Sequence, residues 1–208
     1  MSPFHLLELI ISFALLIVAM SVHEFSHGWV AYKLGDPTAK YAGRFTLNPL
    51  AHIDPIGTVL LPLLLFITTA GRFLFGYAKP VPINFAALRN PQRDIIWVGL
   101  AGPLSNIIFA AILSAVLKFS PDIAFIYAIL TRLIFINIVL AVFNLIPIPP
   151  LDGSRVLMGL LPSRLALQYA SIEPFGFIII MMLLFTGTLG AIIEPALTLI
   201  LKLLGIRY

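Results

Sequence analysis

Five long apolar stretches run through the chain, separated by shorter segments that hold most of the charged and turn-forming residues. These stretches cover residues 6–34, 56–75, 95–117, 123–146 and 175–205. About 20 consecutive apolar residues are enough for a helix to cross the hydrocarbon core of a bilayer. The pattern therefore predicts an all-α polytopic membrane protein. Its core is expected to be three transmembrane helices, at about 6–34, 95–117 and 123–146.

Two of the five stretches are interrupted by helix-breaking residues. Residues 56–75 contain Pro62 and Gly71, so we expect a re-entrant segment there instead of a full crossing. Residues 175–205 are interrupted at Gly187, which predicts two short C-terminal membrane helices.

The linker of residues 76–93 has a different pattern. Pro80 and Pro82 lie in a run of alternating residues, which favours an edge strand over a helix. We expect a short strand-like loop at residues 77–84 that can hold an extended peptide by edge pairing. A lid or a plain surface loop fits the same residues equally well.

The composition agrees with a membrane protein and leaves no room for a separate soluble domain. Apolar residues make up 60% of the chain, charged residues 11%, and the mean hydropathy is +1.05. Soluble domains carry about 25% charged residues. We therefore expect a single integral-membrane domain over residues 1–208. The 13 Lys and Arg residues lie between apolar runs, so they indicate topology and no nucleic-acid partner. The absence of cysteine excludes disulfides and thiolate chemistry.

The sharpest chemical feature is His23-Glu24-Phe25-Ser26-His27, inside the first apolar stretch. Residues four positions apart share one face of a helix, so both imidazoles can bind one zinc ion. Glu24 is then placed to act as the general base toward a zinc-activated water. Histidines that merely cap or snorkel fit the pair less well, because ionisable residues deep in an apolar helix are costly and usually functional.

A catalytic zinc site also needs a third protein ligand. The candidates downstream are His52, Asp36, Asp54, Asp94, Asp122, Asp152, Glu173 and Glu194. Asp152 stands out because it follows Pro149 and Pro150 in a stiff turn that can fold a short carboxylate back toward the bilayer. A turn-forming aspartate before Gly153 would explain the same residue without a metal.

Three motifs in order carry a family resemblance: HEFSH (23–27), AGPLSN (101–106) and NLIPIPPLDG (144–153). Together they resemble the site-2 protease family of intramembrane zinc metalloproteases, over a catalytic core of residues 6–161. The resemblance implies one zinc ion per chain, with Asp152 as its third ligand. It also implies that Asn144 helps to bind substrate or to polarise the scissile carbonyl.

Two further residues fall within the resemblance. The run NPLAHIDPIGT (48–58) resembles the compact subgroup without a PDZ or other sensing domain, in which His52 also faces the site. A polar residue at a membrane boundary is the equal alternative for His52. For Asn106, a polar contact between closely packed helices near Gly102 is the simpler interpretation.

Topology follows from the need for His23, His27 and Asp152 to meet. Stretches 6–34 and 123–146 must then end on the same side, so one of the two stretches between them does not span. With residues 56–75 re-entrant, most Lys and Arg residues share one side, which is the positive-inside pattern. Lys202 and Arg207 join that side if the last stretch crosses twice.

These observations predict an intramembrane metalloendopeptidase in the cell membrane, with its active site accessible from the cytoplasm. Its expected partners are the lipid bilayer and transmembrane protein substrates, which it would cleave in or near their membrane segments. A membrane metal transporter or metal-binding protein is the alternative, but it has no need of Glu24 between the two histidines.

Overall fold

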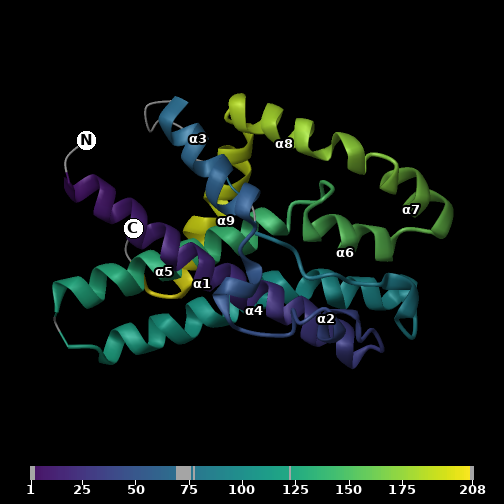
Figure 1. The fold of residues 1–208 in the computed structure, drawn as a ribbon, viewed down its shortest axis with the longest axis horizontal. Helices are drawn as coiled ribbons and strands as arrows, with labels where there is room; N and C mark the ends of the chain where they lie inside the picture. Colours follow the sequence, from purple (N-terminus) through teal and green to yellow (C-terminus); the bar gives the residue numbers. More distant parts are fainter. Residues whose placement is uncertain (1–2, 69–75, 77, 122, 207–208) are drawn as a thin grey trace.

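The computed structural model describes residues 3–68, 76, 78–121 and 123–206, and in these residues it is all-helical (Figure 1). The longer helices are α1 (Pro3–Lys33), α4 (Pro91–Phe119), α5 (Ala124–Asn144), α8 (Gly176–Phe185) and α9 (Thr188–Leu203). The shorter helices are α2 (Thr38–Tyr41), α3 (Leu61–Thr68), α6 (Asp152–Leu160) and α7 (Ser163–Ala170). Single turns complete the described elements: η1 (Pro49–His52), η2 (Pro55–Leu60), η3 (Phe85–Ala87) and η4 (Glu173–Phe175).

The three predicted core helices are confirmed as α1, α4 and α5. Each is long and apolar enough to cross a membrane, and the segment Ser163–Phe185 is a fourth such helix in the described part of the chain. The chain is therefore a multi-pass membrane protein. Helices suit this setting because every backbone group finds its hydrogen-bond partner within the segment.

The interrupted stretch of residues 56–75 begins as the π-helical turn η2 and continues as α3. Asp54 caps this element by accepting hydrogen bonds from the backbone amides of Ile56 (3.0 Å) and Gly57 (2.6 Å). From Pro55 to Thr68 the element has 14 residues, fewer than the roughly 20 that a crossing needs. Residues 69–75 lie outside the described residues, so the re-entrant path remains a prediction.

The loop predicted before α4 is present, but residues 78–84 form no strand. Pro80 and Pro82 have no backbone N–H, which an edge strand tolerates on its outer side, so the prolines alone do not explain the missing strand. Two donors on the other side are already bonded outside any sheet: Lys79 N–H donates to the carbonyl of His52 (2.9 Å), and Val81 N–H donates to Glu24 Oε2 (2.7 Å). Residue 77 lies outside the described residues.

The two C-terminal helices are confirmed as α8 and α9, and the chain turns between them at Gly187. This residue has φ 75°, a left-handed conformation that glycine adopts without strain. The sequence pattern did not predict α6 and α7, which lie before α8. Arg164 and Gln168 interrupt the apolar pattern of α7, so the sequence does not indicate a membrane helix there.

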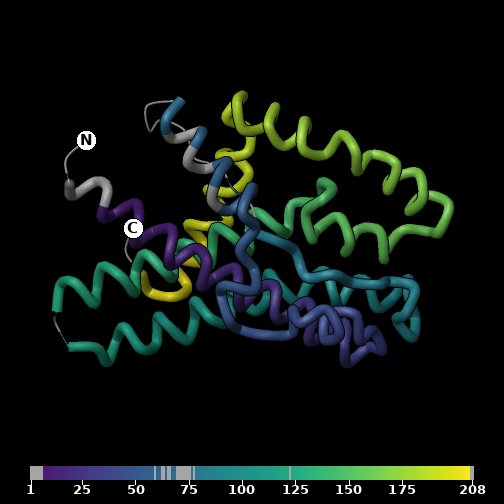
Figure 2. The backbone as a smooth tube through the Cα atoms, in the orientation of Figure 1, coloured from purple at the N-terminus to yellow at the C-terminus, as the bar shows by residue number. Residues whose placement is uncertain are grey.

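Helices α1, α4, α5 and α9 pack around a common apolar core, and α4 and α5 run antiparallel side by side (Figure 2). The fully buried core includes Ala19 of α1, Ala110 of α4 and Ile134 of α5. Small residues such as these alanines allow membrane helices to approach closely, because no large side chain holds the backbones apart.

The basic residues gather at one end of the helices. Arg89 N–H donates to the carbonyl of Leu34 (3.0 Å), and Gln92 Nε2 donates to that of Leu161 (2.9 Å), which holds the start of α4 beside the ends of α1 and α6. The connection from α4 to α5 lies at the opposite end of the molecule (Figure 1). Lys33 is the last residue of α1, Lys40 lies in α2, Arg89 lies just before α4 and Arg93 in its first turn, and Arg155 and Arg164 lie in α6 and α7.

Lys202 does not join the basic end. Ser114 Oγ of α4 donates to the carbonyl of Leu204 (2.8 Å), and Gly205 lies against the side chain of Lys118. The end of α9 is therefore beside the end of α4, so Lys202 lies with Lys118 away from the basic end. Arg207 is outside the described residues.

This arrangement gives a test of topology in a chain without cysteine. Single cysteines at Lys40, Lys79 and Arg155 should react with a membrane-impermeant thiol reagent from one side of the membrane. A cysteine at Lys118 should react from the other side only, since α4 spans roughly 43 Å at 1.5 Å per residue over its 29 residues. Opposite labelling of positions 40 and 79 would mean that residues 56–75 cross the bilayer.

Candidate metal centre and active site

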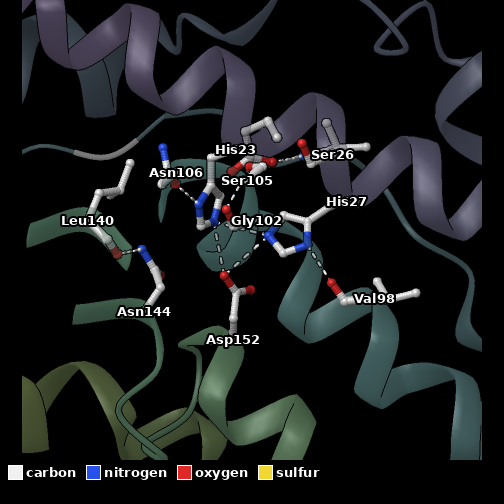
Figure 3. Close-up of polar contacts among 12 residues, drawn as sticks. His23, Ser26, His27, Val98, Gly102, Ser105, Asn106, Leu140, Asn144 and Asp152 are labelled. Carbon is white, nitrogen blue, oxygen red and sulfur yellow. Dashed lines mark hydrogen bonds and ion pairs between the residues drawn. The ribbon is translucent and has the colours of Figure 1, made fainter. Parts of the chain in front are cut away.

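Two histidines of α1 and one aspartate of α6 converge on a single point inside the bundle (Figure 3). Asp152 Oδ2 lies 2.9 Å from His23 Nε2 and 3.2 Å from His27 Nε2. The two Nε2 atoms are 3.0 Å apart. Both histidines are buried. In the described part of the chain this is the only group of three residues able to hold a metal ion.

Asp152 is the first residue of α6, and the chain positions it through the glycine that follows. A Cβ atom on Gly153 would collide with the carbonyl of Leu145 at the end of α5. Without that Cβ, α6 can begin directly against α5 and its first side chain faces α1. The amino end of a helix also favours a negative charge.

Helix α4 supplies the surface on which both imidazoles rest. A Cβ on Gly102 would lie 2.5 Å from His23 Nε2 and would also collide with His27 Nε2, so only a glycine allows this approach. His27 Nδ1 donates to the carbonyl of Val98 (2.7 Å), and His23 Nδ1 donates to Asn106 Oδ1 (2.6 Å). The three residues of α4 are four positions apart, so they lie along one face.

The donor set fits zinc. Two imidazole nitrogens and one carboxylate oxygen are typical protein ligands of a catalytic zinc ion, which keeps its fourth position open. The hydrogen bonds at both Nδ1 atoms leave the Nε2 lone pairs directed at the shared point, as outer-shell partners of zinc histidines normally do. The bare backbone of Gly102 leaves space beside those nitrogens.

The site opens into a cavity of about 750 Å³. His23, Glu24, His27, Asn144 and Asp152 all line this cavity. Glu24 lies outside the group of three possible ligands, which leaves its carboxylate available for proton transfer.

The sequence also predicts that Asn144 and His52 face the site, and the structure places these two residues in different surroundings. Asn144 lies at the end of α5, donates through Nδ2 to the carbonyl of Leu140 (2.9 Å) and lines the cavity. His52 is buried in η1, where its Nε2 bonds the carbonyl of Thr46 (2.9 Å). Among the described residues, the cavity lining does not include His52.

The contact between Asn106 and His23 is the feature that sequence reasoning missed. The sequence indicated a polar contact between packed helices near Gly102, and Asn106 does make one. Its partner is the imidazole of His23, however, so the contact belongs to the candidate metal centre. The sequence does contain a feature that points to this contact: Gly102 and Asn106 lie four residues apart on one face of an apolar helix.

Comparison with known proteins gives one family match. The model of peptidase family M50 matches residues 120–187, which include Asn144 and Asp152. No solved structure matches the chain significantly.

Curated relatives cover most of the chain. YwhC of Bacillus subtilis is 39% identical over 191 residues, which is 88% of this chain and 83% of the relative. Rip2 of Mycolicibacterium smegmatis is 31% identical over 176 residues, which is 84% of this chain and 66% of the relative. MJ0392 of Methanocaldococcus jannaschii is 27% identical over 73% of this chain and 34% of the relative. The names of all three include the words zinc metalloprotease.

The close approach at Gly102 predicts that Gly102→Ala disrupts metal binding. The added methyl group would push α4 or the imidazoles away, and loss of ligand orientation typically weakens metal binding about 10- to 100-fold. The measurement is zinc affinity of the purified protein by chelator competition. Gly190→Ala is the matched control, because a Cβ at Gly190 of α9 meets nothing within 4 Å. Wild-type zinc affinity in Gly102→Ala would contradict the packing described.

Proposed function

The chain belongs to peptidase family M50 and is a metalloprotease, and from this premise we propose that it hydrolyses peptide bonds in or near transmembrane segments of membrane proteins. The observation that carries the proposal is the convergence of His23, His27 and Asp152 beside Glu24, on the wall of one cavity inside a bundle of membrane helices.

We assign one zinc ion per chain to His23, His27 and Asp152. When bound, zinc supplies a Lewis acid that activates water and polarises a substrate carbonyl. The family and the names of its relatives support zinc, and the donor set agrees with it.

Glu24 is proposed as the general base. It follows His23 directly on α1 and lines the same cavity, so its carboxylate can take a proton from water and return it to the leaving amine. The backbone N–H of Val81, 2.7 Å from Glu24 Oε2, fixes the orientation of this carboxylate. Such a bond holds the proton acceptor in place before substrate binds.

Asn144 is proposed to bind the substrate. Its side chain and that of His27 lie on opposite sides of the Asp152 carboxylate in Figure 3. Its amide lines the cavity, where it can donate a hydrogen bond to the scissile carbonyl as negative charge develops on the oxygen. His52 has no place in the proposed reaction, because its ring is buried against Thr46.

The cavity wall supports an apolar, membrane-embedded substrate. Side chains of α1, α5 and α8 contribute to it: Met20, Leu140, Phe143, Phe177 and Ile180. Peptide bonds in a transmembrane helix are hydrogen-bonded within that helix, so the substrate must unwind locally before its carbonyl reaches the site. We propose that the unwound segment lies along residues 78–83, which form part of the same wall.

The site is proposed to be accessible from the cytoplasm. Asp152 and the end of α1 belong to the basic end of the helices, and basic residues are enriched on the cytoplasmic side of membrane proteins. The other function considered, metal transport, would require further ligand groups along a path. In the described residues there is one such group.

Glu24→Gln should abolish cleavage of single-span membrane substrates while zinc content stays near one per chain. A glutamine cannot accept the proton, and loss of a general base lowers rates roughly 10²- to 10⁴-fold. The measurements are substrate cleavage in reconstituted vesicles and metal analysis of the same preparation.

Glu8→Gln is the matched control, since it makes the same change at an exposed position of the same helix. It should cleave at the wild-type rate. Wild-type cleavage by Glu24→Gln would sink the proposed role of Glu24, and loss of zinc would move Glu24 into the ligand set.

A further inference from the structure

Two fully buried asparagines link the metal centre to a third helix. Asn106 of α4 and Asn137 of α5 are both 0% exposed. Asn106 Nδ2 donates to Asn137 Oδ1 (2.7 Å) and to the carbonyl of Ala19 on α1 (3.1 Å). Asn137 Nδ2 donates in turn to the carbonyl of Leu133 on its own helix (2.8 Å). The chain of hydrogen bonds ends at His23 Nδ1, 2.6 Å from Asn106 Oδ1.

The bond to the Leu133 carbonyl determines which atom donates and which accepts in every hydrogen bond of this network. The Leu133 carbonyl can only accept, so the amino group of Asn137 faces it and Asn137 Oδ1 faces Asn106. Asn106 must then present its amino group to Asn137, and the Ala19 carbonyl requires the same orientation. Asn106 Oδ1 is left for His23, so His23 carries its proton on Nδ1 and its lone pair on Nε2.

We propose that Asn137 is a positioning residue for the metal centre, although its hydrogen bonds go to Asn106 and Leu133 and it is not part of the cavity lining. By orienting the amide of Asn106, it selects the His23 tautomer whose Nε2 can bind zinc. This inference rests on the proposed metal centre, because the selected tautomer has a role only if Nε2 binds a metal.

The placement of the pair argues for a role beyond helix packing. Buried amides are costly unless fully bonded, and apolar side chains of similar size would hold α4 against α5 equally well. The Asn106 amide contacts His23 directly, and both of its N–H groups donate hydrogen bonds. The other imidazole, that of His27, is oriented by the backbone carbonyl of Val98. Only His23 depends on side chains for its orientation.

The experiment measures zinc affinity by chelator competition, together with the thermal unfolding of the metal-free protein. Asn106→Leu should weaken zinc binding about 10- to 100-fold, the range for outer-shell partners of metal ligands. Asn137→Leu should weaken it about tenfold, because only the Ala19 carbonyl would then hold the orientation of the Asn106 amide. Asn137→Asp keeps an acceptor for Asn106 and should bind zinc within about threefold of wild type.

Comparing the zinc affinities of the single and double variants distinguishes a positioning role of Asn137 from a packing role. If the asparagines act as one chain, the double variant Asn106→Leu/Asn137→Leu should bind zinc no more weakly than Asn106→Leu alone. Ser114→Ala is the matched control, since Ser114 makes a buried contact between helices, to Leu204, that does not reach the site. It should lower thermal stability and leave zinc affinity unchanged. Asn137→Ala removes the amide without added bulk, and is expected to behave as Asn137→Leu does.

Three results would overturn the inference: wild-type zinc affinity in Asn137→Leu or Asn137→Ala, additive losses in the double variant, or a tenfold loss in Asn137→Asp. If neither apolar variant folded, Asn137→Asp would still test the inference, because a tenfold loss of zinc affinity there would contradict it. Absence of zinc binding by the wild-type protein would be a different failure, that of the proposed metal centre itself.

Discussion

The packing of helix α4 against helix α1 determines the positions of both histidines, and the rest of the site depends on it. At its middle, Gly102 brings bare backbone against both imidazoles. One turn earlier, the carbonyl of Val98 accepts from His27, and one turn later the amide of Asn106 accepts from His23. The antiparallel run of the two helices makes this matching possible, since the later histidine meets the earlier residue of α4. A change in the distance between these helices would disturb both imidazoles together.

The membrane setting explains why so many groups in this region are bonded in fixed directions. Polar groups in an apolar phase are costly unless each finds a partner, and the partners here also determine which atoms face the cavity. Two carboxylates on or next to α1 hold the loop that lines one side of the cavity. Glu24 accepts from Val81 N–H (2.7 Å), and the fully buried Asp36 accepts from Asn84 N–H (2.7 Å). The proposed base therefore has a structural partner before substrate arrives.

Much of this could be predicted from the sequence, because lipid forces long apolar segments into helices and because ligand spacing on a helix is regular. The strand expected at residues 77–84 is absent from the described residues 78–84, because Lys79 and Val81 donate to His52 and Glu24 and no second strand lies beside them in the described residues. Asn137 could not be found from spacing, because its bond to Asn106 joins residues far apart in the sequence. For His52, the sequence could not distinguish a cavity-facing ring from one turned to Thr46.

The central claim is that His23, His27 and Asp152 bind one zinc ion. X-ray absorption at the zinc edge of the metal-loaded protein tests it most directly, because it reports the donor atoms themselves. The account predicts two imidazole nitrogens and oxygen donors at about 2.0–2.2 Å. In Asp152→Ala, one protein oxygen should be lost and binding should weaken sharply. A spectrum and zinc content unchanged by Asp152→Ala would contradict the claim and show that the third ligand lies elsewhere.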